Sequence, residues 1–131
     1  MPEAKKHILI VEDERALSHA LEITLKKEGY DIMIASDGEE GLRRIQEYHF
    51  DLVLLDIIMP RMDGFTLLKI AKEQGRSSAS IPIIVLSNLG QTEDLKTAMA
   101  LGAIQYLVKA NSPFPKVLRA IKAELNKGKG A

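Results

Sequence analysis

The amino-acid sequence predicts a single doubly wound α/β domain, in which five helices cover both faces of a five-stranded parallel sheet. Three observations support this fold class. Short runs of Ile, Val and Leu recur along the 131 residues without alternating with polar residues, which is typical of strands buried on both faces. The segments between these runs carry apolar residues at helical spacing. The length fits one domain, and a chain without cysteine folds without disulfide bonds.

The first half of the chain contains two predicted strands, each followed by a predicted helix. The strands are the apolar run Ile8–Val11 and the weaker run Ile32–Ala35. A leucine at every fourth residue, with a glycine where a C-terminal cap belongs, indicates the first helix. These residues are Leu17, Leu21, Leu25 and Gly29. The second helix follows a turn at Asp37 and Gly38, and its apolar positions are Leu42 and Ile45.

The second half of the chain repeats the alternation of strand and helix. Its strands are predicted at Leu52–Leu55, Ile83–Leu86 and Tyr106–Val108. The apolar positions that mark the two helices between them are Phe65, Leu68 and Ala71, and then Leu95, Ala98 and Met99. The last helix is expected to begin with Ser112 as its N-cap and Pro113 in its first turn. We predict one domain over residues 1–125, and a flexible tail or the start of a linker at 126–131.

Composition and charge exclude several classes of function. The 18 basic and 18 acidic residues give no net charge, so a bulk electrostatic grip on nucleic acid is not expected. The absence of cysteine excludes thiolate metal sites and thiol nucleophiles. The apolar runs are too short to span a membrane, and no signal peptide precedes the first strand. The sequence therefore predicts a cytoplasmic protein without a membrane partner.

Polar side chains follow the predicted strands at the points where the strands end. The acids Glu12, Asp13 and Glu14 follow the first strand, Asp56 the third, Ser87 the fourth and Lys109 the fifth. Ligand sites of open α/β sheets lie at the carboxyl ends of the strands, so we expect these side chains to converge. An acid beyond a strand is usually a solvated loop residue or opens a helix. That interpretation fits Asp56 less well, because apolar residues flank it and an isolated buried carboxylate is costly.

The chemistry that these residues could carry out is phosphoryl transfer. Clustered carboxylates favour a hard cation such as Mg²⁺, which takes oxygen ligands and leaves coordination positions for phosphate. A hydroxyl and an ammonium nearby would hold the rest of a phosphoryl group. His7, His19 and His49 do not follow a strand at this edge, and we expect them at surface or packing positions. The carboxylate of Asp56 can itself attack phosphorus and form an acyl phosphate.

With these residues, the sequence resembles a response-regulator receiver domain of two-component signalling, of the kind found in chemotaxis regulators. The resemblance runs from end to end. The matching residues are Glu12 and Asp13, then Asp56 with Met59-Pro60-Arg61-Met62-Asp63-Gly64, then Ser87 and Lys109. It implies a flavodoxin-like sheet with the strand order 2-1-3-4-5.

The resemblance also implies a role for each site residue. Asp56 is expected to accept a phosphoryl group from a histidine kinase or a histidine phosphotransfer protein. The expected Mg²⁺ ligands are Glu12, Asp13, Asp56 and the backbone carbonyl of Ile58. Ser87 and Lys109 are expected to bind phosphoryl oxygens, and Ser87 with Tyr106 to form a switch. The domain would catalyse only its own phosphorylation and dephosphorylation, and a protein target would bind the face made by the fourth helix, fifth strand and last helix.

The sequence departs from the family pattern at two places. Ala110 stands where a proline usually follows the lysine, and we predict a trans Lys109–Ala110 bond because a cis bond without proline costs about 3–4 kcal/mol. Ile104 and Gln105 stand where acidic residues usually precede the switch aromatic. This second departure concerns output, and we expect it to prevent the two-fold dimer that some receivers form on phosphorylation.

Other interpretations of the site are weaker. A haloacid-dehalogenase-type phosphatase needs a second aspartate two residues after its nucleophile, where this chain has Ile58. A flavin-binding relative would need a small-residue phosphate loop after the first strand, where the acids would repel phosphate. No P-loop motif occurs. The remaining alternative is a receiver-like interaction module that works without phosphorylation.

Overall fold

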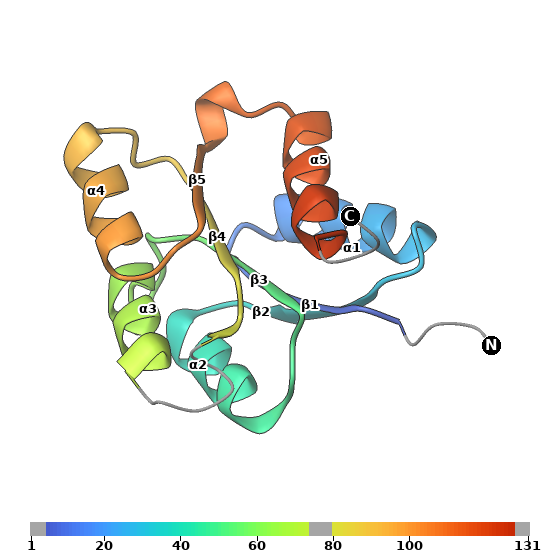
Figure 1. The fold of residues 1–131 in the computed structure, drawn as a ribbon, viewed down its shortest axis with the longest axis horizontal. Coiled ribbons are helices and arrows are strands. Elements are labelled where there is room, and N and C mark those ends of the chain that lie inside the picture. Colours follow the sequence, from blue (N-terminus) through green and yellow to red (C-terminus); the bar gives the residue numbers. More distant parts are fainter. Residues whose placement is uncertain (1–4, 74–79, 128–131) are drawn as a thin grey trace.

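The computed structural model describes residues 5–73 and 80–127, in which five strands form one parallel sheet (Figure 1). The strands are β1 (His7–Val11), β2 (Asp31–Ala35), β3 (Leu52–Leu55), β4 (Ile83–Ser87) and β5 (Gln105–Val108). Their order across the sheet is β2-β1-β3-β4-β5, and every neighbouring pair is parallel. The predicted fold class and the strand order implied by the resemblance are both confirmed.

Five helices alternate with the strands and cover the two faces of the sheet. They are α1 (Arg15–Lys27), α2 (Gly38–Glu47), α3 (Gly64–Glu73), α4 (Thr92–Ala100) and α5 (Phe114–Leu125). Helices α1 and α5 lie on one face, and α2, α3 and α4 lie on the other (Figure 1). Successive side chains of a strand point to opposite faces, so Leu9 of β1 packs toward α2–α4 and Ile10 toward α1 and α5.

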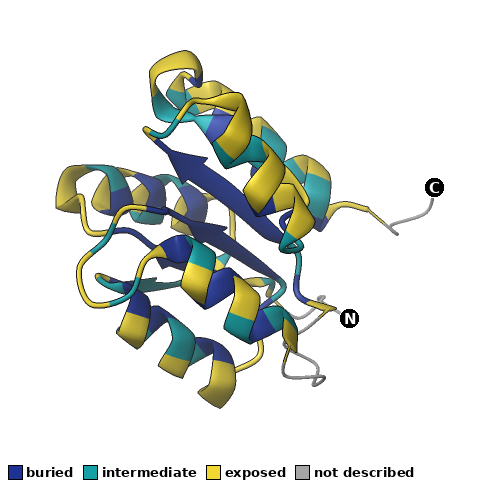
Figure 2. Ribbon diagram, turned by 90° about the vertical axis from the view of Figure 1, so that its left-hand side faces the viewer, coloured by how far each residue is buried: buried dark blue, intermediate teal, exposed yellow. Residues whose placement is uncertain are grey.

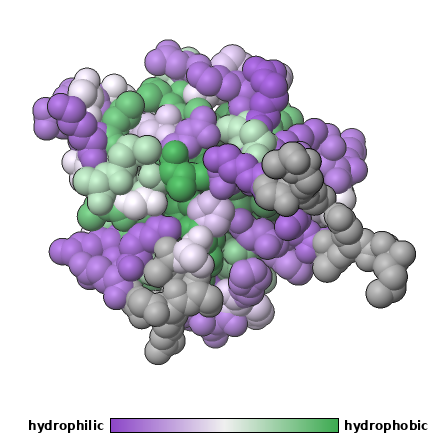
Figure 3. Space-filling view, viewed as in Figure 1, coloured by the Kyte–Doolittle hydropathy of each residue, from purple (hydrophilic) through white to green (hydrophobic). Residues whose placement is uncertain are grey.

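The burial of the strands agrees with their composition. Apart from His7, every residue of β1, β3 and β4 is buried, whereas the edge strands β2 and β5 are mostly half-buried. Figure 2 shows the buried strands between helices whose outer faces are exposed. In Figure 3 hydrophilic side chains surround the border of the molecule, and hydrophobic ones come to the surface between the helices. The edge position of β2 explains why its apolar signal is weaker than that of the central strands.

The last helix begins later than the sequence predicts. The assignment of Ser112 as N-cap is wrong, because α5 starts at Phe114 and Pro113 is the N-cap. The carbonyl of Pro113 accepts hydrogen bonds from the amides of Lys116 (2.8 Å) and Val117 (3.2 Å). Ser112 is instead buried at the end of the short 3-10 turn that follows β5. A proline N-cap carries no side-chain cap, so the usual N-cap pattern does not detect this helix start.

In α4 the buried residue is Ala98, and Met99, which was expected on its apolar face, is exposed. The three histidines are exposed, as expected.

All peptide bonds of the described residues are trans, which confirms the prediction for Lys109–Ala110. No helix in the described part of the chain has the length and apolar character to cross a membrane. Residues 128–131 of the expected tail lie outside the described residues, and the domain limits stay a prediction.

Candidate functional site

Three carboxylates meet at the carboxyl edge of the sheet. Glu12 and Asp13 follow β1, and Asp56 follows the neighbouring strand β3. One oxygen atom from each carboxylate lies within 4.8 Å of the others. Glu12 and Asp56 are only 4% and 6% exposed, whereas Asp13 is open to solvent. The structure thus brings together the acids that follow these two strands.

Backbone hydrogen bonds fix the two buried acids directly after their strands. The amide of Glu12 donates to the carbonyl of Ala35 (3.0 Å), and the amide of Asp56 donates to the carbonyl of Val11 (3.0 Å). Asp56 Oδ1 accepts a hydrogen bond from the amide of Ile57 at 2.7 Å. One carboxylate oxygen of Asp56 is therefore held by the backbone, and the other faces the site.

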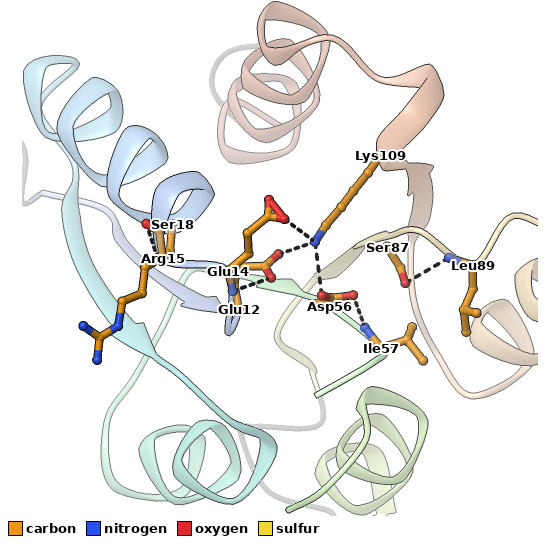
Figure 4. A network of polar contacts seen from close by, with 9 residues as sticks. All are labelled: Glu12, Glu14, Arg15, Ser18, Asp56, Ile57, Ser87, Leu89 and Lys109. Atoms are coloured by element: carbon orange, nitrogen blue, oxygen red, sulfur yellow. Dashed lines mark hydrogen bonds and ion pairs between the residues drawn. The ribbon is translucent and has the colours of Figure 1, made fainter. Parts of the chain in front are cut away.

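Lys109 reaches from the end of β5 into this cluster (Figure 4). Its Nζ lies 2.9 Å from Glu12 Oε1 and 3.2 Å from Asp56 Oδ2, and its side chain is 13% exposed. Glu14 Oε2 lies 3.9 Å from the same Nζ. One ammonium neutralises only part of the charge on the surrounding carboxylates, so the site remains a place for a further cation.

Burial disfavours the charged forms of both Glu12 and Lys109, whereas the hydrogen bond between these two side chains favours both charged forms. Desolvation raises the pKa of Glu12 from 4.5 to about 7, because it outweighs the stabilising hydrogen bond from Lys109. The charge of Asp56 adds to the increase. Burial alone would lower the pKa of Lys109, but the hydrogen bond to Glu12 and the charge of Asp56 more than compensate, and the pKa is raised. The lysine therefore stays cationic at neutral pH, whereas Glu12 is partly protonated there.

The donor set fits Mg²⁺. Glu12, Asp13 and Asp56 supply only carboxylate oxygens, which are the ligands that this cation prefers. Two of the residues are buried and one is exposed, so the cluster is open on one side for water or phosphate. Ile58 stands two residues after Asp56, and because its aliphatic side chain has no ligand atom, the backbone carbonyl is the one oxygen it could offer to a metal.

The two residues expected to form a switch are joined through the loop after β4. Ser87 is the last residue of β4 and is fully buried, and its Oγ accepts a hydrogen bond from the Leu89 amide at 3.3 Å. The hydroxyl of Tyr106 donates to the Leu89 carbonyl at 2.7 Å. Desolvation raises the pKa of Tyr106, and a hydrogen bond with the Ser87 side chain partly offsets this increase. Both side chains thus contact the same backbone segment.

One residue of this region does not emerge from sequence reasoning. Leu89 contributes through its backbone, and backbone groups leave no signal in a residue pattern. Glu14, by contrast, is the third of the acids that the sequence places directly after the first strand. It is the N-cap of α1, yet its side chain makes no cap hydrogen bond and lies near Lys109 instead.

The fold and the site together define a signalling domain of the receiver class. Residues 8–122 match the model of the response regulator receiver domain, and the chain therefore belongs to this family, whose members serve two-component systems. Such domains are typically non-enzymatic signalling modules, and membership implies a histidine kinase as partner.

Individual relatives agree with this assignment. The chain is 42% identical over 109 residues to the probable transcriptional regulator ycf27 of Cyanophora paradoxa. The aligned region covers 83% of this chain and 44% of that protein. The CheY-like receiver domain protein of Methanospirillum hungatei has a TM-score of 0.85 at 31% identity, covering 95% of this chain and 96% of that one. The chemotaxis response regulator CheY4 of Vibrio cholerae has a TM-score of 0.82 at 30% identity, covering 92% and 99%. The chain spans less than half the length of the curated relative.

Proposed function

We propose that this chain is a phosphorylatable receiver domain, which accepts a phosphoryl group on Asp56 from a histidine kinase or a histidine phosphotransfer protein. The observation that carries this proposal is the environment of the Asp56 carboxylate. Its Oδ1 is held by the Ile57 amide at 2.7 Å, and its Oδ2 faces the Lys109 ammonium at 3.2 Å. An oriented carboxylate beside a cation and two further acids is the arrangement that phosphoryl transfer to aspartate requires.

The residues of the chain have distinct tasks in this reaction. An oxygen of Asp56 attacks phosphorus, the P–O bond forms, and the P–N bond of the phosphohistidine donor breaks, with the imidazole nitrogen keeping the electron pair. Lys109 binds a phosphoryl oxygen and the Ser87 hydroxyl donates to another. Mg²⁺ held by Glu12, Asp13, Asp56 and the Ile58 carbonyl would neutralise the charge that otherwise keeps a phosphoryl group away from the acids.

The proposal predicts Mg²⁺-dependent labelling of Asp56. Incubation of the wild type with acetyl phosphate and Mg²⁺ should add the mass of one phosphoryl group, and chelation of Mg²⁺ should abolish the addition. Asp56→Asn should abolish it too, because an amide is not a nucleophile for phosphorus. The matched control is Asp51→Asn, since Asp51 lies before β3 and outside the cluster. Intact-protein mass spectrometry measures all four samples.

Each contrary outcome has a defined meaning. An acid-labile phosphoryl group that persists in Asp56→Asn would show that another residue is the acceptor. Absence of any label on the folded wild type would favour the receiver-like module that acts without phosphorylation.

We also propose that the signal leaves through the face formed by α4, β5 and α5. This face carries exposed apolar residues, with Met99 of α4 47% exposed and Ile104, just before β5, 39% exposed. Arg119 of α5 is exposed as well. A face with exposed apolar side chains and few cations suits a protein partner better than nucleic acid. A kinase that works in the cytoplasm would place the domain in that compartment.

A further inference from the structure

The loop between β3 and α3 contains a strained backbone turn. Arg61 has a φ of 70°, the one positive value at a non-glycine residue within 5–73 and 80–127. Around it, the amide of Met62 donates to the carbonyl of Pro60 at 2.8 Å. A hydrogen bond that spans two residues, with positive φ at the residue between them, defines the rare and strained form of the γ-turn. Such a turn persists only where surrounding contacts hold it.

The side chain of Arg61 supplies one of these contacts. Its Nη1 lies 3.0 Å from Asp37 Oδ2, and the Asp37 side chain is only 14% exposed. The other oxygen of Asp37, Oδ1, accepts a hydrogen bond from the amide of Glu40 at 2.8 Å and so caps α2. Both carboxylate oxygens are engaged, and the helix therefore fixes the direction in which Asp37 meets Arg61.

The backbone of the β3–α3 loop packs against the start of α2 at one end and against the residues that follow β3 at the other. A Cβ atom on Gly38, the first residue of α2, would collide with the carbonyl of Met62. Beyond the turn, the amide of Gly64 donates to the carbonyl of Ile57 at 2.7 Å, and a Cβ atom on Gly64 would collide with the backbone of Asp56. The loop that follows the phosphoacceptor is thus confined between the start of α2 and the end of β3.

The segment that leads from β2 into α2 also contacts the other buried acid of the site. The carbonyl of Ala35 accepts the hydrogen bond from the amide of Glu12 at 3.0 Å. Two residues later, Asp37 binds Arg61. The same segment therefore contacts the backbone of a metal-binding acid on one side and the loop after Asp56 on the other.

We propose that Arg61 and Asp37 form a positioning pair, which holds the β3–α3 loop in the shape that lets Asp56 and the Ile58 carbonyl bind Mg²⁺. The inference rests on the proposed function and adds residues that act on it. Neither side chain belongs to the carboxylate cluster, so both act through the loop backbone. Groups that orient metal ligands without touching the metal commonly affect affinity.

The test is the dissociation constant of Mg²⁺, measured by NMR titration on the amides of Ile57, Ile58 and Gly64. Arg61→Ala should weaken binding by roughly 10-fold, the lower end of the range for residues that support a ligand. The direction of the change in Mg²⁺ affinity is diagnostic. Loss of a positive charge near an acidic site would by itself strengthen cation binding, so only loss of positioning predicts a weaker complex. The control is Arg43→Ala, which removes an exposed arginine of α2.

A second variant distinguishes the effect of backbone strain on Mg²⁺ affinity from the effect of the ion pair. Glycine adopts positive φ without cost, so Arg61→Gly removes the ion pair but keeps the turn, and it should lose less affinity than Arg61→Ala. Asp37→Asn keeps an N-cap residue, and combined with Arg61→Ala it should weaken binding by less than the product of the two single fold-changes, because both substitutions break the same pair.

The outcomes distinguish the inference from the proposed function. If the wild type does not bind Mg²⁺, the proposed function fails and the role of the pair fails with it. If the wild type binds Mg²⁺ and Arg61→Ala binds it equally well or more tightly, the positioning role is overturned while the proposed function stands. Urea unfolding of each variant without Mg²⁺ shows whether an affinity loss exceeds any general loss of stability.

Discussion

Glu12 is the residue at which burial and charge conflict most strongly. It is 4% exposed, and desolvation raises its pKa to about 7. In the folded, metal-free domain this carboxyl therefore holds its proton at pH values where the unfolded chain has already released it. Folding is then linked to proton uptake, and the stability contributed by the protonated form is present below pH 4.5 and is lost as the pH rises through about 7.

This linkage predicts how the stability of the metal-free domain depends on pH. The free energy of unfolding should fall between roughly pH 5 and pH 8 in the wild type, and Glu12→Gln should lack that part of the decline because it never ionises. Urea unfolding in the presence of a chelator measures both proteins, with Glu47→Gln, an exposed helix position, as control. An equal decline in the wild type and in Glu12→Gln would contradict the prediction.

At the residue scale, the sequence predicts which side chains converge but not how they bind one another. Carboxyl ends of parallel strands share one edge, and that is sufficient to bring Glu12, Asp56 and Lys109 together. The Lys109–Asp56 hydrogen bond joins residues 53 apart, and the Arg61–Asp37 bond joins residues 24 apart. Such pairs depend on side-chain direction and loop shape, and a residue pattern specifies neither.

Among the structural elements, α4 is the helix that buries the fewest of its own residues. Ala98 is its one buried residue among those described, whereas α5 buries Val117, Ile121 and Leu125. The loop that leads into α4 carries Leu89, whose backbone contacts both Ser87 and Tyr106. Elements with few buried contacts are those that move at low free-energy cost. We therefore expect a change at Ser87 to be transmitted to α4.

This arrangement predicts the behaviour of Ser87→Ala. The variant should still be labelled by acetyl phosphate, but the response of the Tyr106 ring should be reduced because the bond between Ser87 and the phosphoryl group is missing. NMR of the Tyr106 ring with Mg²⁺, with and without beryllofluoride, measures this response. Ser18→Ala is the control, since Ser18 is buried on α1 and its hydroxyl donates to the Arg15 carbonyl of the same helix region. A Tyr106 signal unchanged by beryllofluoride in the wild type would exclude this switch.

The limits of a helix or strand are predicted more accurately where the element is more deeply buried. The central strands β1, β3 and β4 are apolar on both faces, and their predicted limits differ from the structure by at most one residue. Two predictions are wrong, namely the start of α5 and the place of Met99 on the apolar face of α4. The first depends on which carbonyl accepts the first helical hydrogen bond, and the second involves a helix with a single buried residue.

For the whole molecule, the composition of the α4–β5–α5 face bears on oligomeric state. Ile104 and Gln105 occupy the positions ahead of Tyr106, and no described residue forms an ion pair with the exposed Arg119. Asp94 of α4 is not a free substitute, because its Oδ2 accepts a hydrogen bond from the Gln91 amide at 3.2 Å and caps the helix. Surface ion pairs are typically worth below about 1 kcal/mol each, but they select partners and register.

We therefore predict that activation does not produce a two-fold dimer through this face. Sedimentation velocity with Mg²⁺ should show the same monomeric species with and without beryllofluoride. A dimer that forms only with beryllofluoride and is dissociated by Arg119→Glu would contradict the prediction, and it would mean that other contacts replace the missing acids.

The central claim is that Asp56 receives the phosphoryl group, and chemical trapping tests it most directly. An aspartyl phosphate is an acyl phosphate, which borohydride reduces to a stable alcohol at the same residue. After treatment with acetyl phosphate, Mg²⁺ and borohydride, peptide mass spectrometry should locate homoserine at position 56 and at no other aspartate. Reduction at another aspartate, or at none in a sample whose intact mass shows phosphorylation, would contradict the account.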